Sequence, residues 1–140
     1  MASQRRYNAV GMPVFTKRWD DPIAPTDGTR ILITRYRPRG LPKAHETWTE
    51  WLSHLGPSPV LLAAFHGKGR AAIGWTTYRT AYLKEMRQQS AAIAELARRS
   101  SGGETITLLC SSACVRETRC HRSLLRGLIE PGDALNPNNR

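Results

Sequence analysis

This sequence has few acidic residues and no long apolar segment. Only 11 of its 140 residues are aspartate or glutamate, against 21 lysines and arginines, so the formal net charge is +10. No pair of carboxylates stands out for general acid–base catalysis, and Asp27 lies in turn-rich sequence where side-chain capping explains it. Because no stretch resembles a signal peptide or a membrane span, we expect a cytoplasmic protein without a membrane partner.

The chain also has only three cysteines, an odd number that excludes a fully paired disulfide framework within one molecule. All three lie close together, as Cys110, Cys114 and Cys120, and His121 follows directly. This clustering favours a reducing compartment and a local site over a scaffold of cross-links.

The composition is otherwise that of a globular protein. Apolar residues make up 40% of the chain and charged residues 23%, and the length suits one domain with its own core. We expect a flexible basic arm over residues 1–12, a single α/β domain over 13–130 and a polar tail over 131–140. Arginine supplies 17 of the 21 positive residues, and its planar fork suits phosphate and nucleic acid better than lysine does.

Apolar runs and turn signals predict an alternation of strands and helices. Strands are expected over 13–18, 30–34 and 105–109, and helices over 47–55, 58–65 and 73–98, with a last helix beginning near residue 120. This order predicts a small Rossmann-like three-layer sandwich whose largely parallel sheet has about three to five strands.

The same motifs resemble a known family. Arg35 to Gly40 form an Arg-x-x-Pro-Arg-Gly element, and the later pieces are Leu108-Leu109-Cys110 and Cys120-His121-Arg122. Their order and spacing resemble the family catalogued as domain of unknown function 488 (DUF488). The resemblance implies a compact Rossmann-like α/β domain but no particular reaction. This chain departs from the family pattern in having Arg37 where many relatives carry tryptophan, Ser112 near an acidic position, and the additional Cys114.

The cysteine segment is predicted to connect a strand to a helix. Open α/β sheets bind ligands at the carboxyl ends of their strands, and the arginine-rich loop also follows a strand. We therefore expect the two loops to meet at one edge of the sheet and to bind a phosphate-bearing ligand, a nucleotide or a nucleic-acid component. The predicted ligand-binding residues are Arg18, Arg35, Arg37, Arg39 and Arg122.

The predicted catalytic residues are Cys110, Cys120 and His121. A thiol beside arginines and a helix N-terminus has its thiolate favoured, and a histidine near it carries protons around neutral pH. Cys110, across the loop, is the expected partner of His121. The sequence does not decide whether the protein is an enzyme, and it indicates no cofactor and no oligomeric state.

Two other functions remain open from the sequence. One is a non-enzymatic nucleic-acid-binding module, in which Arg5-Arg6, Arg98-Arg99 and the arginine-rich loop follow the phosphate backbone. The other is a metal site. Cys110, Cys114, Cys120 and His121 have the donor atoms of a tetrahedral zinc or iron site, although their spacing lacks a C-x2-C pair.

Overall fold

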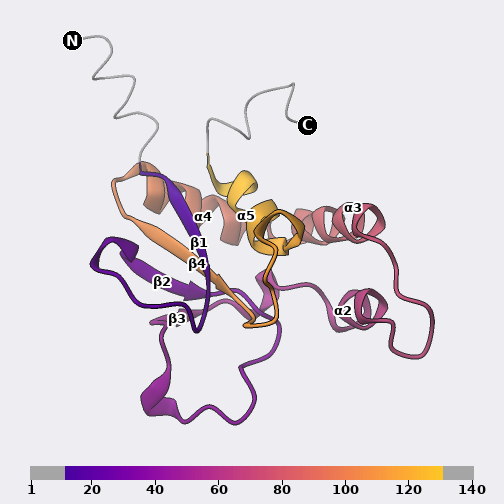
Figure 1. Cartoon of the computed structure of the whole chain (residues 1–140). Coiled ribbons are helices and arrows are strands. Elements are labelled where there is room, and N and C mark those ends of the chain that lie inside the picture. The colour runs from indigo at the N-terminus through magenta and orange to yellow at the C-terminus, as the bar shows by residue number, and fades with distance from the viewer. Residues whose placement is uncertain (1–11, 131–140) are drawn as a thin grey trace.

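A computed structural model describes residues 12–130 of this protein (Figure 1). Its four strands form one sheet in the order β1-β4-β2-β3, and every neighbouring pair is parallel. The strands are β1 (Val14–Arg18), β2 (Thr29–Leu32), β3 (Glu50–Trp51) and β4 (Ile106–Cys110). The predicted α/β class and small parallel sheet are confirmed. The predicted tail and all but the last residue of the predicted arm lie outside the described residues.

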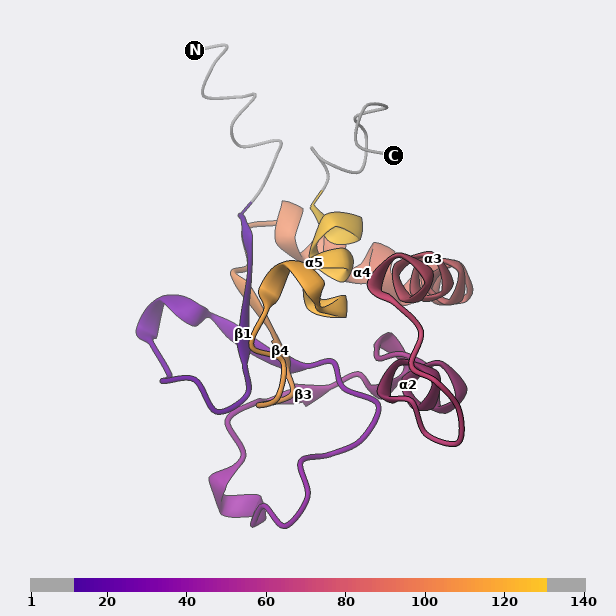
Figure 2. The same cartoon turned by 45° about the vertical axis from the view of Figure 1, so that its right-hand side comes forward.

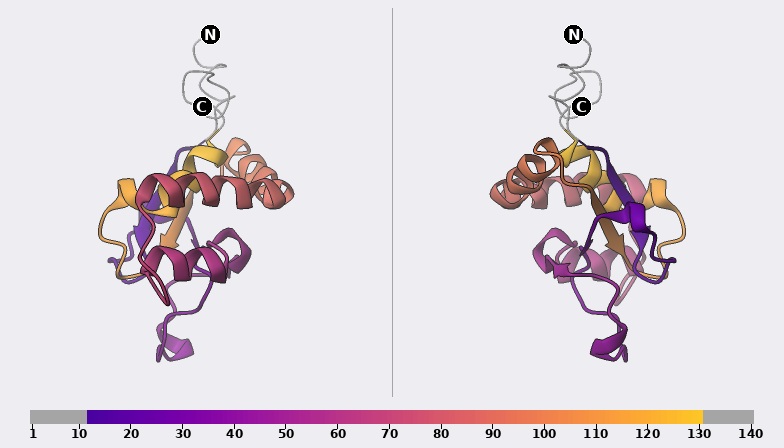
Figure 3. Two further views of the ribbon diagram at one scale, coloured as in Figure 1. Left: turned by 90° about the vertical axis from the view of Figure 1, so that its right-hand side faces the viewer. Right: turned by 90° about the vertical axis from the view of Figure 1, so that its left-hand side faces the viewer.

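Four α-helices accompany the sheet: α2 (Pro59–His66), α3 (Trp75–Met86), α4 (Ser90–Ser101) and α5 (His121–Ile129). They lie together on one side of the strands (Figure 2), with α2 and α3 nearest the viewer in the left view of Figure 3. Their apolar side chains share one core with the alternate strand residues Val14, Ile31, Ile106 and Leu108. Among the described residues, no helix combines the length and the apolar character that a membrane span requires.

The opposite face of the sheet is covered by loops. Leu32 and Leu109 point to this side and pack with Trp48, and Trp19 and Leu41 pack against them. These three covering residues come from the segments that follow β1 and β2. One layer of the sandwich is therefore built from irregular chain rather than from helices.

The helix predicted over residues 47–55 is wrong. The segment forms β3 and a 3-10 turn at Ser53–Leu55 instead. The edge of β2 supplies backbone partners, because Thr49 donates to the carbonyl of Arg30 and Leu52 to that of Leu32. Thr47 and Glu50, whose spacing suggested a helix cap, are used in tertiary contacts with Trp19 and Arg99.

The long helix predicted over residues 73–98 is divided into two. A 3-10 turn at Arg87–Gln89 separates α3 from α4, although no proline or glycine lies there. Both helices contact α5. The bend between them therefore lets the apolar side chains of residues 75–101 stay against the core along the whole segment. The short helix capped by Ser58 is confirmed: its hydroxyl accepts a hydrogen bond from the Leu61 amide.

A buried ion pair anchors the turn before β2. The guanidinium of Arg30 contacts the Asp27 carboxylate, and both side chains are 5% exposed. Lys17 lies 2.7 Å from the second oxygen of the same carboxylate. Gly28 follows in a left-handed conformation (φ 64°), where a Cβ would collide with the Thr105 carbonyl. The sharp reversal therefore needs glycine and fixes where β2 begins beside β4.

Candidate functional site

A cavity of about 760 Å³ opens at the carboxyl ends of β2 and β4. The arginine-rich loop lines one part of it and the cysteine loop another, while α2 and α3 contribute Phe65 and Tyr78. The two loops that the sequence predicted to meet do lie around one cavity. The parallel order explains this, because β2 and β4 are neighbours and their following segments leave the same edge.

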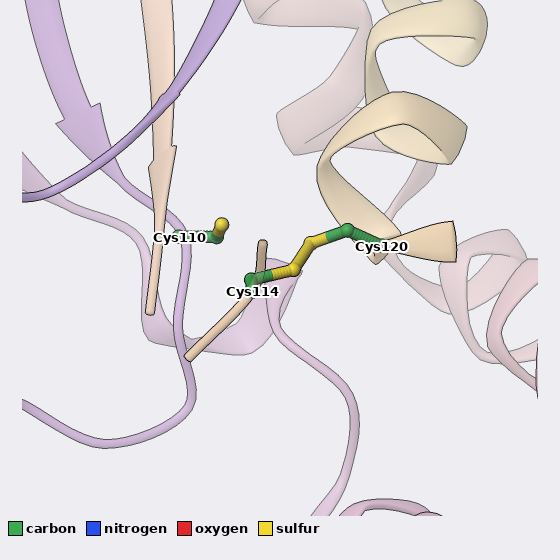
Figure 4. A group of neighbouring side chains, drawn as sticks. All are labelled: Cys110, Cys114 and Cys120. Carbon is green, nitrogen blue, oxygen red and sulfur yellow. A yellow bond between two sulfur atoms is a disulfide. The ribbon is translucent and has the colours of Figure 1, made fainter. Parts of the chain in front are cut away.

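All three cysteines line this cavity. They come from three different segments of the chain, as Figure 4 shows. Cys110 ends β4, Cys114 lies in the following loop and Cys120 precedes α5. Cys114 and Cys120 form a disulfide, and Cys110 is a free thiol. All three sulfur atoms lie within 4.8 Å of one another. The local site predicted from the clustering is therefore present, and two of its sulfurs are already bonded.

The Cys110 thiol does not favour its thiolate. Burial raises the pKa of Cys110 to about 11, and the nearby Arg122 and Arg18 offset only part of that effect. The sequence-based expectation of an activated Cys110 therefore stays a prediction, and burial of the thiol acts against it. That expectation counted the neighbouring positive charges but not the loss of hydration at the buried end of a central strand.

His121 is buried and neutral. Its Nε2 lies 2.8 Å from the carbonyl oxygen of Ile33, which only accepts hydrogen bonds, so Nε2 carries the proton. Burial lowers the pKa of His121 to about 4. The ring is therefore neutral near pH 7, and its role as a proton carrier stays a prediction that burial acts against. Its other nitrogen, Nδ1, lies 3.9 Å from the Cys120 sulfur, which carries no proton while the disulfide is closed. The ring therefore lies beside Cys120, and not beside Cys110 as expected.

The predicted arginine clamp is only partly available. Arg35 donates to the carbonyls of Pro57 and Gly56, which holds it on the cavity wall. Arg37 pairs with Glu46 and lies over the Trp48 ring. Arg39 is exposed, and its guanidinium has no hydrogen-bond or ion-pair partner within residues 12–130. Of the three, Arg39 is the residue free to meet a ligand.

Two predicted ligand-binding arginines do not line the cavity. Arg18 is held by Asp21, with a further contact to the Ser112 carbonyl. Arg122 is buried behind the cysteine loop, where it donates to the Cys114 carbonyl over 3.3 Å. The structure gives these two residues positions that support the loop rather than face the cavity.

The sequence reasoning missed other residues of the cavity. Arg116 and Arg119 lie in the cysteine loop, are exposed, and have guanidinium groups with no partner in the described part of the chain. Their Arg-x-x-Arg spacing beside the cysteines was a usable signal. Phe65 and Tyr78, whose rings stack with centroids 4.2 Å apart, form an apolar wall. Their periodicity predicted core packing and gave no sign of a cavity beside them.

The sulfur cluster has the donor set of a metal site in its reduced form. Three thiolates within 4.8 Å of one another are able to bind a zinc or iron ion. His121 is not part of this set, because only the three cysteine sulfurs lie within that distance of one another. With the disulfide closed, only Cys110 keeps a free sulfur.

Comparisons with known proteins agree with this picture of a small domain. A family model described as DUF488-N3a, the active DUF488-N3 subclade, matches residues 14–132. The uncharacterized protein YeaO of Escherichia coli strain K12 is 35% identical over 104 residues, which cover 72% of this chain and 84% of that protein. No solved structure matches the chain significantly.

Proposed function

We propose that this chain, which belongs to the DUF488 family, binds a phosphate-bearing ligand, a nucleotide or a nucleic-acid component, in the cavity at the end of β2 and β4. One observation carries the proposal. Three exposed arginines, Arg39, Arg116 and Arg119, converge on the cavity from two loops, and within residues 12–130 none has an acidic partner. Guanidinium groups without partners at a cavity mouth attract anions, and their planar forks match phosphate oxygens.

The walls of the cavity suit the remainder of such a ligand. Phe65 presents an aromatic ring backed by the buried Tyr78, Leu62 adds an aliphatic surface, and Tyr36 is 58% exposed at the rim. Aromatic faces of this kind stack on nucleobases without strong sequence preference. The volume of about 760 Å³ falls in the usual range of small-molecule sites, so one nucleotide fits it.

The start of α5 adds a further favourable field. Cys120 and His121 line the cavity, so the positive end of the helix dipole lies beside it. The stabilisation of an exposed anion by the helix dipole is modest, on the order of 0.3–1 kcal/mol. The arginines therefore supply most of the expected affinity.

The test is a binding series with inorganic phosphate, nucleoside monophosphates and short single-stranded DNA, measured by calorimetry and thermal shift. A ligand of the folded state raises the melting temperature. Replacing Arg39, Arg116 or Arg119 by alanine is expected to weaken binding roughly tenfold each, because charge-assisted hydrogen bonds are lost. The matched control is Arg87→Ala, which removes the same charge from an exposed position between α3 and α4, away from the cavity lining.

The series also separates the cavity from a diffuse basic surface. If binding is at the cavity, nucleotides compete with DNA and the three arginine variants lose both ligands. If DNA binds with a steep salt dependence, nucleotides do not compete and Arg87→Ala weakens binding as much as Arg39→Ala, a non-specific basic surface explains the data and the proposal fails.

A further inference from the structure

The three cysteine residues differ in their access to solvent. Cys110 is 0% exposed and Cys120 is 3% exposed, whereas Cys114 is only partly buried. All three lie within 4.8 Å of one another at the cavity (Figure 4). A reagent that enters from solvent therefore meets Cys114 first, and Cys120, its disulfide partner, is close enough to react with it afterwards.

We propose that this cluster is a thiol–disulfide exchange centre, in which Cys114 reacts with a small disulfide from solvent and Cys120 resolves the mixed disulfide. The structure shows the oxidised product of that reaction, the Cys114–Cys120 disulfide. We further assign the substrate as a disulfide that carries anionic groups. This second part rests on the proposed function, because Arg116 and Arg119 would hold those groups.

The exchange balances in two steps. The Cys114 thiolate attacks one sulfur of the incoming disulfide, forms a mixed disulfide with it and releases the other half as a thiolate. The Cys120 thiolate then attacks the Cys114 sulfur, closes the disulfide and releases the second half. Two protein thiols are oxidised, one outside disulfide is reduced to two thiols, and the protons pass to the released thiolates. A small dithiol from solvent reverses the sequence by attacking Cys114.

Two neighbouring residues position Cys120 and Cys114 for this chemistry. In the reduced chain the Cys120 thiol has an acceptor in His121 Nδ1, 3.9 Å from its sulfur, and that nitrogen is fixed because Nε2 is bound to Ile33. Arg122 donates to the Cys114 carbonyl, so Cys114 stays beside the start of α5 when the disulfide opens. The geometry needed for closing the disulfide is therefore held by contacts that do not depend on it.

The loop that the disulfide closes also carries the charged residues of the cavity. Arg116 and Arg119 lie between Cys114 and Cys120 in sequence, and both are exposed. A disulfide with carboxylate groups approaching Cys114 would thus meet two guanidinium groups. A disulfide with ammonium groups would be repelled by them, which gives the centre a charge preference.

The experiment uses the full chain, reduced with dithiothreitol and freed of reductant without oxygen. The probes are glutathione disulfide, which is anionic, and cystamine, which is cationic. The products are followed by intact mass and peptide mapping. The wild type is expected to end as the Cys114–Cys120 disulfide without an adduct. Cys120→Ser is expected to keep an adduct on Cys114, because the buried Cys110, whose pKa is raised to about 11, stays a thiol and does not attack it. Cys114→Ser is expected to react at least about tenfold more slowly, since its remaining thiols are buried.

A second measurement uses only the wild type and does not depend on variant folding. Brief labelling of the reduced chain with iodoacetamide is expected to modify Cys114 before the other two cysteines. Equal labelling of all three, an adduct on Cys110 in the Cys120→Ser chain, or failure of the reduced wild type to close the Cys114–Cys120 disulfide would each overturn the exchange centre.

The two proposals fail separately. If Cys114 forms the adduct but reacts equally with both probes, and phosphate does not bind, the anion-binding cavity is wrong while the exchange centre stands. If phosphate and nucleotides bind through the arginines but Cys114 reacts no faster than the buried cysteines, the exchange centre alone is wrong.

Discussion

His121 donates a hydrogen bond from Nε2 to the carbonyl oxygen of Ile33 over 2.8 Å, although 88 residues separate them in the chain. The bond joins the first residue of α5 to the residue that follows β2. It also fixes the ring orientation, so that Nδ1 faces Cys120. The arginine-rich loop begins beside Ile33, and the cysteine loop ends at His121, so the contact joins both loops and makes His121 a positioning residue for the site.

The buried His121 makes stability depend on pH. Its pKa falls from 6.5 to about 4 on folding, because burial disfavours the charged ring, so the unfolded chain binds the extra proton. The contribution is complete above pH 6.5 and is lost as pH falls to about 4, which amounts to about 3 kcal/mol in the free energy of unfolding. Urea unfolding at several pH values measures it.

His121→Gln is the control for that prediction, because its amide keeps a donor for Ile33 but does not titrate. The variant should lack the loss between pH 6.5 and 4 that the wild type shows. If the free energy of unfolding falls equally with pH in the two proteins, then carboxylates, and not His121, cause the pH dependence.

The Cys110 thiol is expected to resist alkylation in the folded protein at neutral pH. Its pKa is about 11, raised by burial and by the nearby Asp20 and Asp21, and lowered only in part by Arg122 and Arg18. Iodoacetamide labelling of the oxidised chain, in which Cys110 is the free thiol, should rise only as pH approaches 11. In the same chain unfolded in urea, labelling of Cys110 should rise at the lower pH at which a solvent-exposed cysteine ionises. Half-maximal labelling of the folded chain near pH 8 would contradict the buried environment.

Removing one partner of the buried pair before β2 should be strongly destabilising. Asp27→Ala leaves the 5% exposed Arg30 without its carboxylate, a loss of about 3–5 kcal/mol in the free energy of unfolding. Glu95→Ala breaks the exposed pair with Arg98 and should change stability by less than about 1 kcal/mol. Denaturant titration of both variants provides the comparison, and similar small effects would show that the buried pair is dispensable.

Opening the Cys114–Cys120 disulfide should weaken anion binding without unfolding the protein. The disulfide closes a loop with a sequence separation of 6, so its reduction is expected to cost about 2 kcal/mol of stability. The same reduction frees the segment that carries Arg116 and Arg119, and ordering it again reduces the affinity for phosphate. Calorimetry with and without dithiothreitol measures the change. In Cys114→Ser, which has no disulfide to open, dithiothreitol should not change the affinity for phosphate. If the affinity of the wild type is also unchanged, the disulfide does not affect anion binding.

Local sequence patterns predicted several elements that need only neighbouring residues. The Ser58 cap and the Asp27-Gly28 turn follow from local hydrogen bonding and backbone freedom. The helix over residues 47–55 could not be rejected in this way, because its aromatic spacing fits a helix as well as a strand. The segment forms a strand because the free edge of β2 offers backbone hydrogen-bond partners to Thr49 and Leu52.

For the candidate site too, some features could be predicted from local sequence patterns and others could not. The placement of Cys110 after a buried strand and of Cys120 before a helix was evident from hydrophobic periodicity, and a parallel sheet then brings the arginine loop to the same edge. Which arginines remain free was not evident. Arg37 is neutralised by Glu46, and Arg122 is turned behind the cysteine loop, while Arg116 and Arg119 face the cavity.

The sequence by itself determined the α/β class, the basic charge and the gathering of thiols at a strand-to-helix junction, because these depend on composition and on short-range periodicity. Only the tertiary structure decided that Cys114 pairs with Cys120, that Cys110 is protonated and that His121 is neutral. Those properties depend on the distance between side chains and on their exclusion from water, and both are set by how distant segments pack.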